Sequence, residues 1–299
     1  MSSPSLSRGF RFVKMHGAGN DYVYVDAAKE GLADLDDNAL ADLARRVSDR
    51  HTGIGGDGLI LVLPDGDADV RMRMFNLDGS EGEMCGNGVR CVAKFAVDEG
   101  LVHVDGETGP IHGDAIRVAT GAGIRDIGLV REQGVIVGAT VDMGEPALGA
   151  DAVGLSGVDD AGGGEVALPG IDRRIVNVST GNPHAVLFVD DLDAVDLPRE
   201  GGFVSTHELF ARGTNAHFVQ VLSRERVRVA HWERGSGPTL ACGTGACAVV
   251  VAGVVTGRLE RDVAVEVPGG VLEIQWGEAA NRLRMTGPAV TVFEGRWPG

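Results

Sequence analysis

The sequence predicts a turn-rich protein of mixed helix and strand, α/β or α+β, built as two similar domains. A Cys-Gly-x-Gly motif occurs twice, at Cys85 and Cys242, and the copies lie 242 − 85 = 157 residues apart, about half of the 299-residue chain. Glycine is abundant, at 46 residues, and aromatic residues make up only 5%, which favours short strands and turns over a helical bundle. A chain of this length accommodates two domains of about 150 residues.

The repetition extends beyond the cysteine motifs. Gly19-Asn20 is echoed by Gly181-Asn182, a spacing of 182 − 20 = 162 residues. A strand beginning near residue 288 is expected to return to the first half. We therefore expect an N-terminal domain of residues 1–137 plus 288–299 and a C-terminal domain of residues 138–287, with a site at their junction.

In the first half, strands are expected at 10–15, 22–26, 59–63 and 70–76, followed by an antiparallel meander of short strands over 101–141. An amphipathic surface helix is expected over 35–49, and an apolar helix over 89–97 after Cys85. Residues 53–58 match G-x-G-x-x-G, but a dinucleotide site needs a strand before this motif and a helix after it. Here the order is reversed, so we expect a tight connection instead.

In the second half, strands are expected at 175–179, 185–189, 216–221, 227–232, 262–267, 271–276 and 283–286. A helix is expected over 203–213, ending in glycine, and an apolar helix over 246–255 after Cys242. The segment 149–164 is rich in Gly, Ala and Asp, so a mobile loop without assigned chemistry is expected there.

Charge and cysteine usage exclude several classes of function. Lys and Arg number 27 against 43 Asp and Glu, so the net charge of −16 argues against nucleic acid or an anionic membrane as a partner. The longest apolar run is too short to span a bilayer. The four cysteines form no Cys-x-x-Cys pair, so zinc-ribbon and thioredoxin sites are disfavoured and no metal is expected. No signal segment is recognisable, and we expect a cytoplasmic protein with reduced thiols.

The two Cys-Gly motifs are candidate catalytic groups, because each precedes an apolar run that reads as a helix. A helix N-terminus carries unpaired N–H groups and a partial positive charge, which favour an anion and can lower the pKa of a thiol. Glycine lets a ligand approach that backbone closely. Two such termini facing each other would form an anion pocket flanked by two sulfurs. The alternative is that both cysteines are buried structural residues.

Polar residues gather at strand ends near both motifs: Asn20, Asn76, Asn182, Asn215, His184, Glu233 and Arg234. Asparagine suits an ammonium–carboxylate pair, and arginine can bind a carboxylate bidentately. Each alone is more often a turn or capping residue. Two opposed thiols without a cofactor motif point to proton transfer on both faces of an amino-acid α-carbon, with Glu233 and His184 as tuners of the thiol pKa values.

The chain resembles the diaminopimelate epimerase family over nearly its whole length. The resemblance rests on the motifs HGAGND (16–21), FNLDGS (75–80), MCGNGVRC (84–91), GNPH (181–184), GTN (213–215), WERG (232–235) and ACGTGA (241–246). It implies an α+β fold of two pseudo-symmetric domains, each a mainly antiparallel sheet wrapped around a central helix, in a homodimer. It also implies a cofactor-independent two-base epimerase that interconverts LL- and meso-2,6-diaminopimelate for lysine and peptidoglycan precursor synthesis.

By the same resemblance, Cys85 and Cys242 are the acid/base thiols, and His184 and Glu233 tune them. Residues implied to bind substrate are Asn20, Asn76, Gly86, Asn87, Asn182, Asn215, Glu233, Arg234, Gly243 and Thr244. Many members carry a substrate-binding glutamine where this chain has Gly58, and some carry a tyrosine at the dimer contact where it has Phe293. Two rivals stay open: a proline or hydroxyproline racemase, and a non-catalytic binding protein or thiol metal site.

Overall fold

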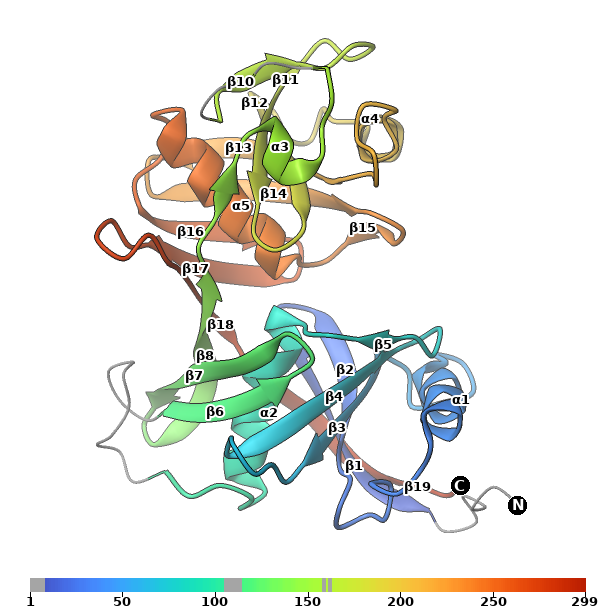
Figure 1. Cartoon of the computed structure of the whole chain (residues 1–299). Coiled ribbons are helices and arrows are strands. Elements are labelled where there is room, and N and C mark those ends of the chain that lie inside the picture. Colours follow the sequence, from blue (N-terminus) through green and yellow to red (C-terminus); the bar gives the residue numbers. More distant parts are fainter. Residues whose placement is uncertain (1–8, 105–114, 158–159, 161–162) are drawn as a thin grey trace. The chain divides into compact units, whose positions relative to one another are not determined.

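The computed structural model describes residues 9–104, 115–157, 160 and 163–299. The chain forms two compact units, unit 1 with Met1–Val141 and Gly287–Gly299, and unit 2 with Asp142–Thr286 (Figure 1). Both boundaries fall inside strands, β8 (Val135–Gly144) and β18 (Leu283–Pro288). The expected domain boundaries, at 137/138 and 287/288, lie near these divisions and stay a prediction.

Unit 1 is built on one curved sheet. Its strands are β1 (Phe10–Gly17), β2 (Asn20–Asp26), β3 (Gly58–Leu63), β4 (Val70–Asn76), β5 (Glu81–Gly82), β6 (Ala115–Thr120), β7 (Gly123–Glu132), β8 and β19 (Val290–Trp297). The order is β19-β1-β2-β3-β4-β6-β7-β8, with β5 added beside β4. The β2–β3 and β4–β6 pairs are parallel and the others antiparallel. The sheet is therefore mainly antiparallel.

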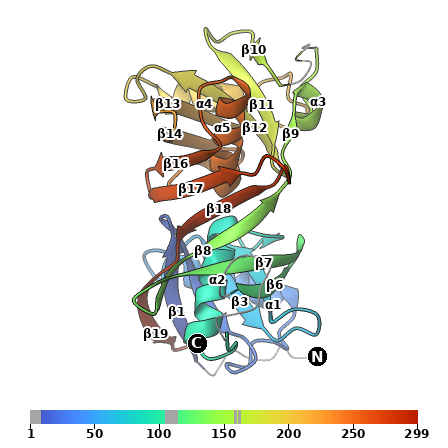
Figure 2. The ribbon, with the colours of Figure 1, turned by 90° about the vertical axis from the view of Figure 1, so that its left-hand side faces the viewer.

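Helix α2 (Gly86–Asp98) lies inside the curve of this sheet. The helix contacts β1 and β2 toward one end of the strand order and β6 and β7 toward the other end. The sheet therefore wraps around the helix (Figure 2). Residues 87–96 of the helix are all buried. Helix α1 (Asp37–Ser48) contacts β2, β3 and β4, and its apolar stripe of Leu40, Leu43, Ala44 and Val47 is buried as the spacing predicted. A helix that covers one side of a sheet needs only one apolar face.

Unit 2 repeats this construction. Its strands are β9 (Ala147–Leu148), β10 (Glu165–Ala167), β11 (Arg174–Ser179), β12 (Pro183–Val189), β13 (Asn215–Ser223), β14 (Arg226–Glu233), β15 (Gly237–Thr239), β16 (Asp262–Val267), β17 (Gly270–Trp276) and β18. The central helix α5 (Gly243–Val255) contacts β11, β12, β13 and β17, and helix α4 (Leu197–Ser205) contacts β13, β14 and β15. Residues 245–253 of α5 are all buried.

The two units have the same order of elements and the same pattern of pairing. The series β1-β2-α1-β3-β4-β5-α2-β6-β7-β8 corresponds to β11-β12-α4-β13-β14-β15-α5-β16-β17-β18. The parallel pairs β2–β3 and β4–β6 correspond to β12–β13 and β14–β16. This confirms the predicted α+β fold of two pseudo-symmetric halves, each a sheet around a central helix.

Two expectations were wrong and one was confirmed. The helix expected over 203–213 is α4, which begins at Leu197 and ends at Ser205, because Asp196 caps its N-terminus and a proline occupies its first turn. Part of the expected mobile loop is helix α3 (Ala150–Val153), and residues 158–159 and 161–162 lie outside the described residues. The last strand does return to the first half, because β19 pairs antiparallel with β1.

Candidate active site

Cys85 lies at the N-terminus of α2 and caps that helix. Its sulfur accepts a hydrogen bond from the Gly88 N–H at 3.3 Å, and its S–H donates to Asn20 Oδ1 at 3.2 Å. The first turn of α2 carries no acidic residue, so the positive end of the helix is not neutralised there. The cap therefore offers a hydrogen-bond partner to the sulfur in both protonation states: an acceptor for the thiol and a donor for the thiolate.

Asn20 is held in one orientation by a cluster of charged residues. Its Nδ2 donates to Asp57 Oδ2 at 2.6 Å, which leaves its Oδ1 directed at Cys85. Arg50 binds the carboxylates of both Asp21, at 2.7 Å, and Asp57, at 3.0 Å. The segment 53–58, which resembles a dinucleotide motif, thus supplies the aspartate that orients a candidate substrate ligand. Sequence reasoning missed Asp57 and Arg50.

The other predicted ligands of unit 1 are at the first turn of α2 and at the end of β4. Asn87 is buried, with an exposed fraction of 3%, and its Oδ1 accepts from Arg90 at 2.9 Å. Arg90 also donates to the Gly86 carbonyl at 3.2 Å. Asn76 donates through Nδ2 to Ser80 Oγ at 3.0 Å. The two Arg90 bonds order the first turn of α2, where backbone N–H groups have no partner within the helix, and the Asn76 bond orders the turn after β4.

The space beside Gly58 is filled, which explains why no side chain stands there. A Cβ at this position would lie 2.1 Å from the Phe75 carbonyl oxygen and 2.9 Å from Cε1 of Tyr22. The Tyr22 ring is buried, and burial together with the nearby Cys85 raises the pKa of its hydroxyl far above the usual value. Tyr22 therefore lies next to both Gly58 and Cys85.

Cys242 occupies the matching position at the N-terminus of α5. It is 4% exposed, and its sulfur lies 3.5 Å from Thr244 Oγ1. Burial raises the pKa of the Cys242 thiol well above its usual value, and the Glu233 carboxylate raises it further. The expectation of a lowered pKa was wrong for this cysteine, because desolvation outweighs the bonds from Thr244 and the Gly245 N–H. Cys242 is therefore a thiol in the unliganded protein.

Glu233, Arg234 and Asn215 are tied together at the end of β14. Glu233 Oε1 accepts from Thr239 Oγ1 at 2.6 Å. Asn215 accepts from the Arg234 backbone N–H at 2.9 Å and donates to the Pro183 carbonyl at 2.9 Å. The Arg234 guanidinium is exposed and donates to the Arg212 carbonyl at 2.8 Å. A guanidinium has five N–H donors, so Arg234 keeps donors with which it can bind a carboxylate.

His184 lies in the interior of unit 2, within hydrogen-bond distance of Asn182. Its Nε2 is 2.8 Å from Asn182 Oδ1 and 3.1 Å from Thr180 Oγ1. Burial lowers the pKa of His184 to about 3, so the ring is neutral at physiological pH. Thr180 also donates to the Thr244 carbonyl at 3.2 Å, which connects this group to the first turn of α5.

Cys91 and Cys247 differ from the two capping cysteines. Both lie within the central helices and are fully buried. Burial raises the pKa of Cys91 to about 11. These two cysteines lie inside their helices, whereas Cys85 and Cys242 stand at the helix N-termini, with Cys85 partly exposed and Cys242 buried.

Comparison with known proteins identifies the family. Residues 12–149 and 176–292 match the sequence profile of a family described as diaminopimelate epimerase. The chain belongs to the diaminopimelate epimerase family. A diaminopimelate epimerase of Desulfovibrio desulfuricans is 49% identical, with 98% of this chain and 99% of that protein covered. One of Moorella thermoacetica is 47% identical, covering 96% and 99%. The family assignment confirms the prediction of an amino-acid epimerase.

Solved structures outside the family share its fold. A phenazine biosynthesis protein of the PhzF family from Bacillus anthracis matches with a TM-score of 0.69 at 16% identity, covering 97% of this chain and 99% of that one. A hydroxyproline epimerase from Agrobacterium vitis, with bound trans-4-hydroxy-L-proline, matches with a TM-score of 0.65 at 16% identity, covering 98% and 92%. At these identities the likeness shows the fold alone.

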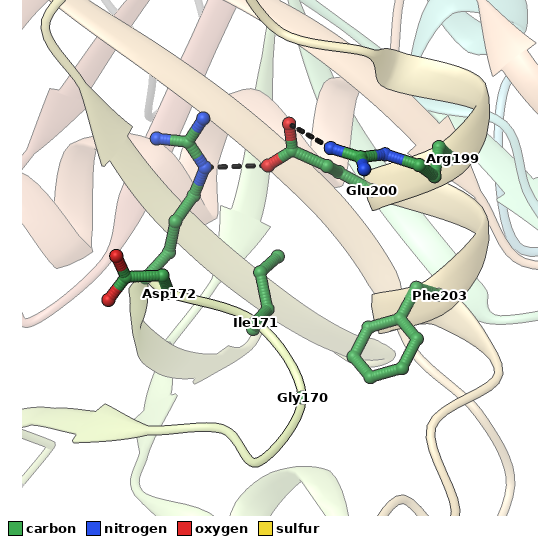
Figure 3. Close-up of a pocket in the computed structure, with 7 residues that line it drawn as sticks. Gly170, Ile171, Asp172, Arg199, Glu200 and Phe203 are labelled. Carbon is green, nitrogen blue, oxygen red and sulfur yellow. Dashed lines mark hydrogen bonds and ion pairs between the residues drawn. The ribbon is translucent and has the colours of Figure 1, made fainter.

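A surface hollow of about 550 Å³ lies elsewhere in unit 2, between the loop before β11 and helix α4 (Figure 3). It is lined by Gly170, Ile171, Asp172, Arg173, Arg199, Glu200 and Phe203, and Arg173 bonds Glu200 at 2.6 Å across it. No residue predicted from the family motifs lines it.

Among the described residues no cluster of His, Cys, Asp and Glu could hold a metal ion, and no helix is long and apolar enough to cross a membrane.

Proposed function

We propose that this chain interconverts LL- and meso-2,6-diaminopimelate without a cofactor, with Cys85 and Cys242 as the two acid/base groups. The observation that carries the proposal is the matched position of these residues. Each is the N-cap of the buried central helix of its unit, at the same point in a repeated topology. The family assignment and the names of the relatives support the substrate.

In the proposed reaction, one cysteine acts as a thiolate and takes the α-proton from one face of the substrate carbon. The C–H electron pair stays on the carbon, which becomes a planar carbanion conjugated with its carboxylate. The other cysteine, as a thiol, then gives its proton to the opposite face, and its S–H electron pair stays on sulfur. The raised pKa of Cys242 supports a resting thiol at that position. Each turnover exchanges the protonation states of the two sulfurs.

The carbanion needs stabilisation of its charge, and the helix N-termini supply it. We assign the reacting carboxylate to the backbone N–H groups of Gly86-Asn87 and Gly243-Thr244, where two helix dipoles present their positive ends. Asn20, Asn76, Asn182, Asn215 and Arg234 are assigned to the unreacting amino-acid head. Glu233 is assigned as the tuner of Cys242, which its effect on that pKa supports. His184 is assigned to the tuning of the thiols as well.

We further propose a homodimer in the cytoplasm. Support for the dimer comes from β19, where Val290, Val292 and Phe293 are 38%, 54% and 46% exposed. Phe293 packs edge-on against Phe12 at 5.9 Å between ring centroids, so its other side is open to a partner. Sedimentation of wild type against Phe293→Asp tests this, and a monomeric wild type at enzyme-assay concentrations would exclude the dimer.

Solvent exchange tests the reaction and the substrate together. In D2O, the wild type is expected to incorporate deuterium at the α-carbon of LL-diaminopimelate and to form the meso isomer, while L-proline stays unlabelled. Labelling of L-proline instead would favour a proline racemase, and no exchange with either would favour a non-catalytic protein. The variants Cys85→Ala and Cys242→Ala should both lose epimerisation while remaining folded, with Cys91→Ala as the matched control. Full activity in either of the first two variants contradicts the two-base mechanism.

A further inference from the structure

Three histidines form a continuous chain of hydrogen bonds in the interior of unit 2. His184 Nδ1 lies 2.8 Å from His217 Nε2, and His217 Nδ1 lies 2.8 Å from His231 Nδ1. The exposed fractions of these side chains are 0%, 0% and 1%. His217 and His231 are opposite each other in the β13–β14 pair, and His184 projects from the neighbouring strand β12. This three-histidine chain leads from the core of unit 2 to the side chain of Asn182.

The partners of His184 determine where its proton lies. Thr180 donates its hydroxyl proton to the Thr244 carbonyl, so toward His184 its oxygen is an acceptor. Asn182 presents its carbonyl oxygen, which is also an acceptor. Two acceptors face His184 Nε2, so that nitrogen carries the proton. Because a neutral imidazole has one N–H, His184 Nδ1 is an acceptor.

The same rule fixes the tautomers of the next two rings. His217 Nε2 must donate to His184 Nδ1, so His217 Nδ1 accepts from His231 Nδ1. His231 Nε2 is then an unprotonated acceptor, and it is buried without a hydrogen-bond partner among the residues that the structure describes. Burial keeps all three rings neutral, since it lowers the pKa of each below its ordinary value. All three protons of the chain therefore point toward Asn182.

The three-histidine chain also contacts the first turn of α5, the helix whose N-cap is Cys242. A Cβ at Gly245 would lie 2.4 Å from Cε1 of His217, so the His217 ring packs directly against the helix backbone at that point. Thr180 binds the Thr244 carbonyl in the same turn. Both contacts connect the three-histidine chain to the first turn of α5.

We propose that His217 and His231 are positioning residues that lock His184 as an Nε2–H donor and thereby hold the Asn182 carbonyl, so that the Asn182 amide N–H groups are presented to the substrate. The consequence for recognition rests on the proposed function, in which Asn182 binds the unreacting head of the substrate. In that role a fixed amide donates to a carboxylate oxygen and rejects an ammonium group at the same point. The tautomer assignment itself does not depend on the reaction.

The test is a pair of substitutions at His231, the histidine farthest from Asn182 in the series of hydrogen bonds. His231→Leu removes the donor to His217 Nδ1, which allows His217 and then His184 to reverse their tautomers and Asn182 to turn over. His231→Gln keeps an amide donor in nearly the same place. We expect His231→Leu to raise the KM for diaminopimelate by about five- to tenfold, the effect of one lost hydrogen bond, with kcat within about twofold. His231→Gln should restore most of the affinity.

Ring nitrogen-15 NMR reads the tautomers directly in the unliganded wild type. We expect protons on His184 Nε2, His217 Nε2 and His231 Nδ1, with no titration of these rings between about pH 5.5 and pH 8.5. A proton on His184 Nδ1, or titration of any of the three rings in this range, overturns the proposal. If His231→Leu does not fold, Thr180→Val replaces it, because loss of that acceptor and donor should also raise KM.

The outcomes separate this proposal from the proposed function. Wild type without epimerase activity would contradict the function, while the NMR spectra would still decide the tautomers. Active wild type with the expected tautomers but an unchanged KM in His231→Leu would contradict the positioning role. A drop in kcat alone in His231→Leu, not rescued by His231→Gln, would show a general packing defect and would also contradict it.

Discussion

The effect of Glu233 on Cys242 can be measured by removing its charge. Glu233→Gln keeps the size of the side chain and an oxygen that can accept from Thr239 Oγ1, a bond of 2.6 Å in the wild type. Burial is the larger cause of the raised pKa of Cys242, and the Glu233 carboxylate is the second. The substitution therefore lowers the pKa of Cys242, but not to that of a free cysteine.

A like charge within about 4–6 Å shifts a pKa by about 1–3 units. Glu233 is itself half-buried and ranks after desolvation as a cause, so we expect the low end of that range. A downward shift of about one unit corresponds to about 1.4 kcal/mol of relief for the thiolate. At a pH below both values, the thiolate fraction of Cys242, and with it the rate of alkylation, should rise about tenfold.

The assay is the pH dependence of Cys242 alkylation by a small haloacetamide in a Cys85→Ala background, followed by peptide mass spectrometry. Glu225→Gln is the matched control, because Glu225 is exposed and precedes the other end of β14. The midpoint for Glu233→Gln should fall by about one pH unit, and that for Glu225→Gln should stay at the wild-type value. An unchanged or higher midpoint in Glu233→Gln, or an equal shift in both variants, would refute the electrostatic argument.

Three further predictions concern the scaffold of the site. Because the pKa values of His184 and His231 are lowered to about 3, their contribution to stability is complete above the unfolded value of about 6.5 and is lost as pH falls from there toward 3. Each of these two histidines should lower the free energy of unfolding by about 2 kcal/mol at pH 5 relative to pH 7.5, measured by urea denaturation. Equal urea midpoints at pH 5 and pH 7.5 would contradict this. Asp57→Ala frees the amide that faces the Cys85 sulfur, so kcat/KM should fall about tenfold or more with the secondary structure intact, and wild-type kinetics would show that the clamp is dispensable. Gly58→Ala should destabilise the protein by about 1–3 kcal/mol because its Cβ meets a carbonyl oxygen at 2.1 Å, while Gly66→Ala, with open space around it, should not, and equal melting temperatures would count against the steric explanation.

Much of the fold follows from local sequence pattern. The apolar alternation and turn residues predicted most strands within a few residues, and the repeat predicted two related halves. The position of α4 could have been found from Asp196 and Pro198, an N-cap and a first-turn proline that precede the expected helix.

The site was only partly accessible to sequence reasoning. Both capping cysteines could be predicted, since Cys-Gly before an apolar run is a local signal of a helix N-terminus. The clamp of Asp57 and Arg50 on Asn20 joins distant segments, so no local pattern indicates it. The raised pKa of Cys242 could not be predicted either, because the helix N-terminus favours the thiolate while the depth of burial, which opposes it, is set by the tertiary structure.

The histidine chain shows the same limit. The sequence pattern places His217 and His231 on strands, and alternation allows both to face inward. Only the register of β13 with β14 and of β12 with β13 brings three rings into line. A one-residue slip in either pairing would turn a ring to the opposite face of the sheet. His184 alone was chosen from the sequence, because the two histidines behind it belong to none of the motifs.

The pairing of β19 with β1 has a consequence for biosynthesis. Unit 2 is continuous in the chain, so all of its strands have been made once residue 286 is synthesised. Synthesis of unit 1 starts before that of unit 2 but is completed after it, because residues 290–297 form the strand that pairs with the outer edge of β1. During translation that edge is an open template for unwanted pairing, and a premature stop just before β19 would leave it permanently uncovered. The codons for residues 290–297 therefore protect a strand that was made much earlier in translation.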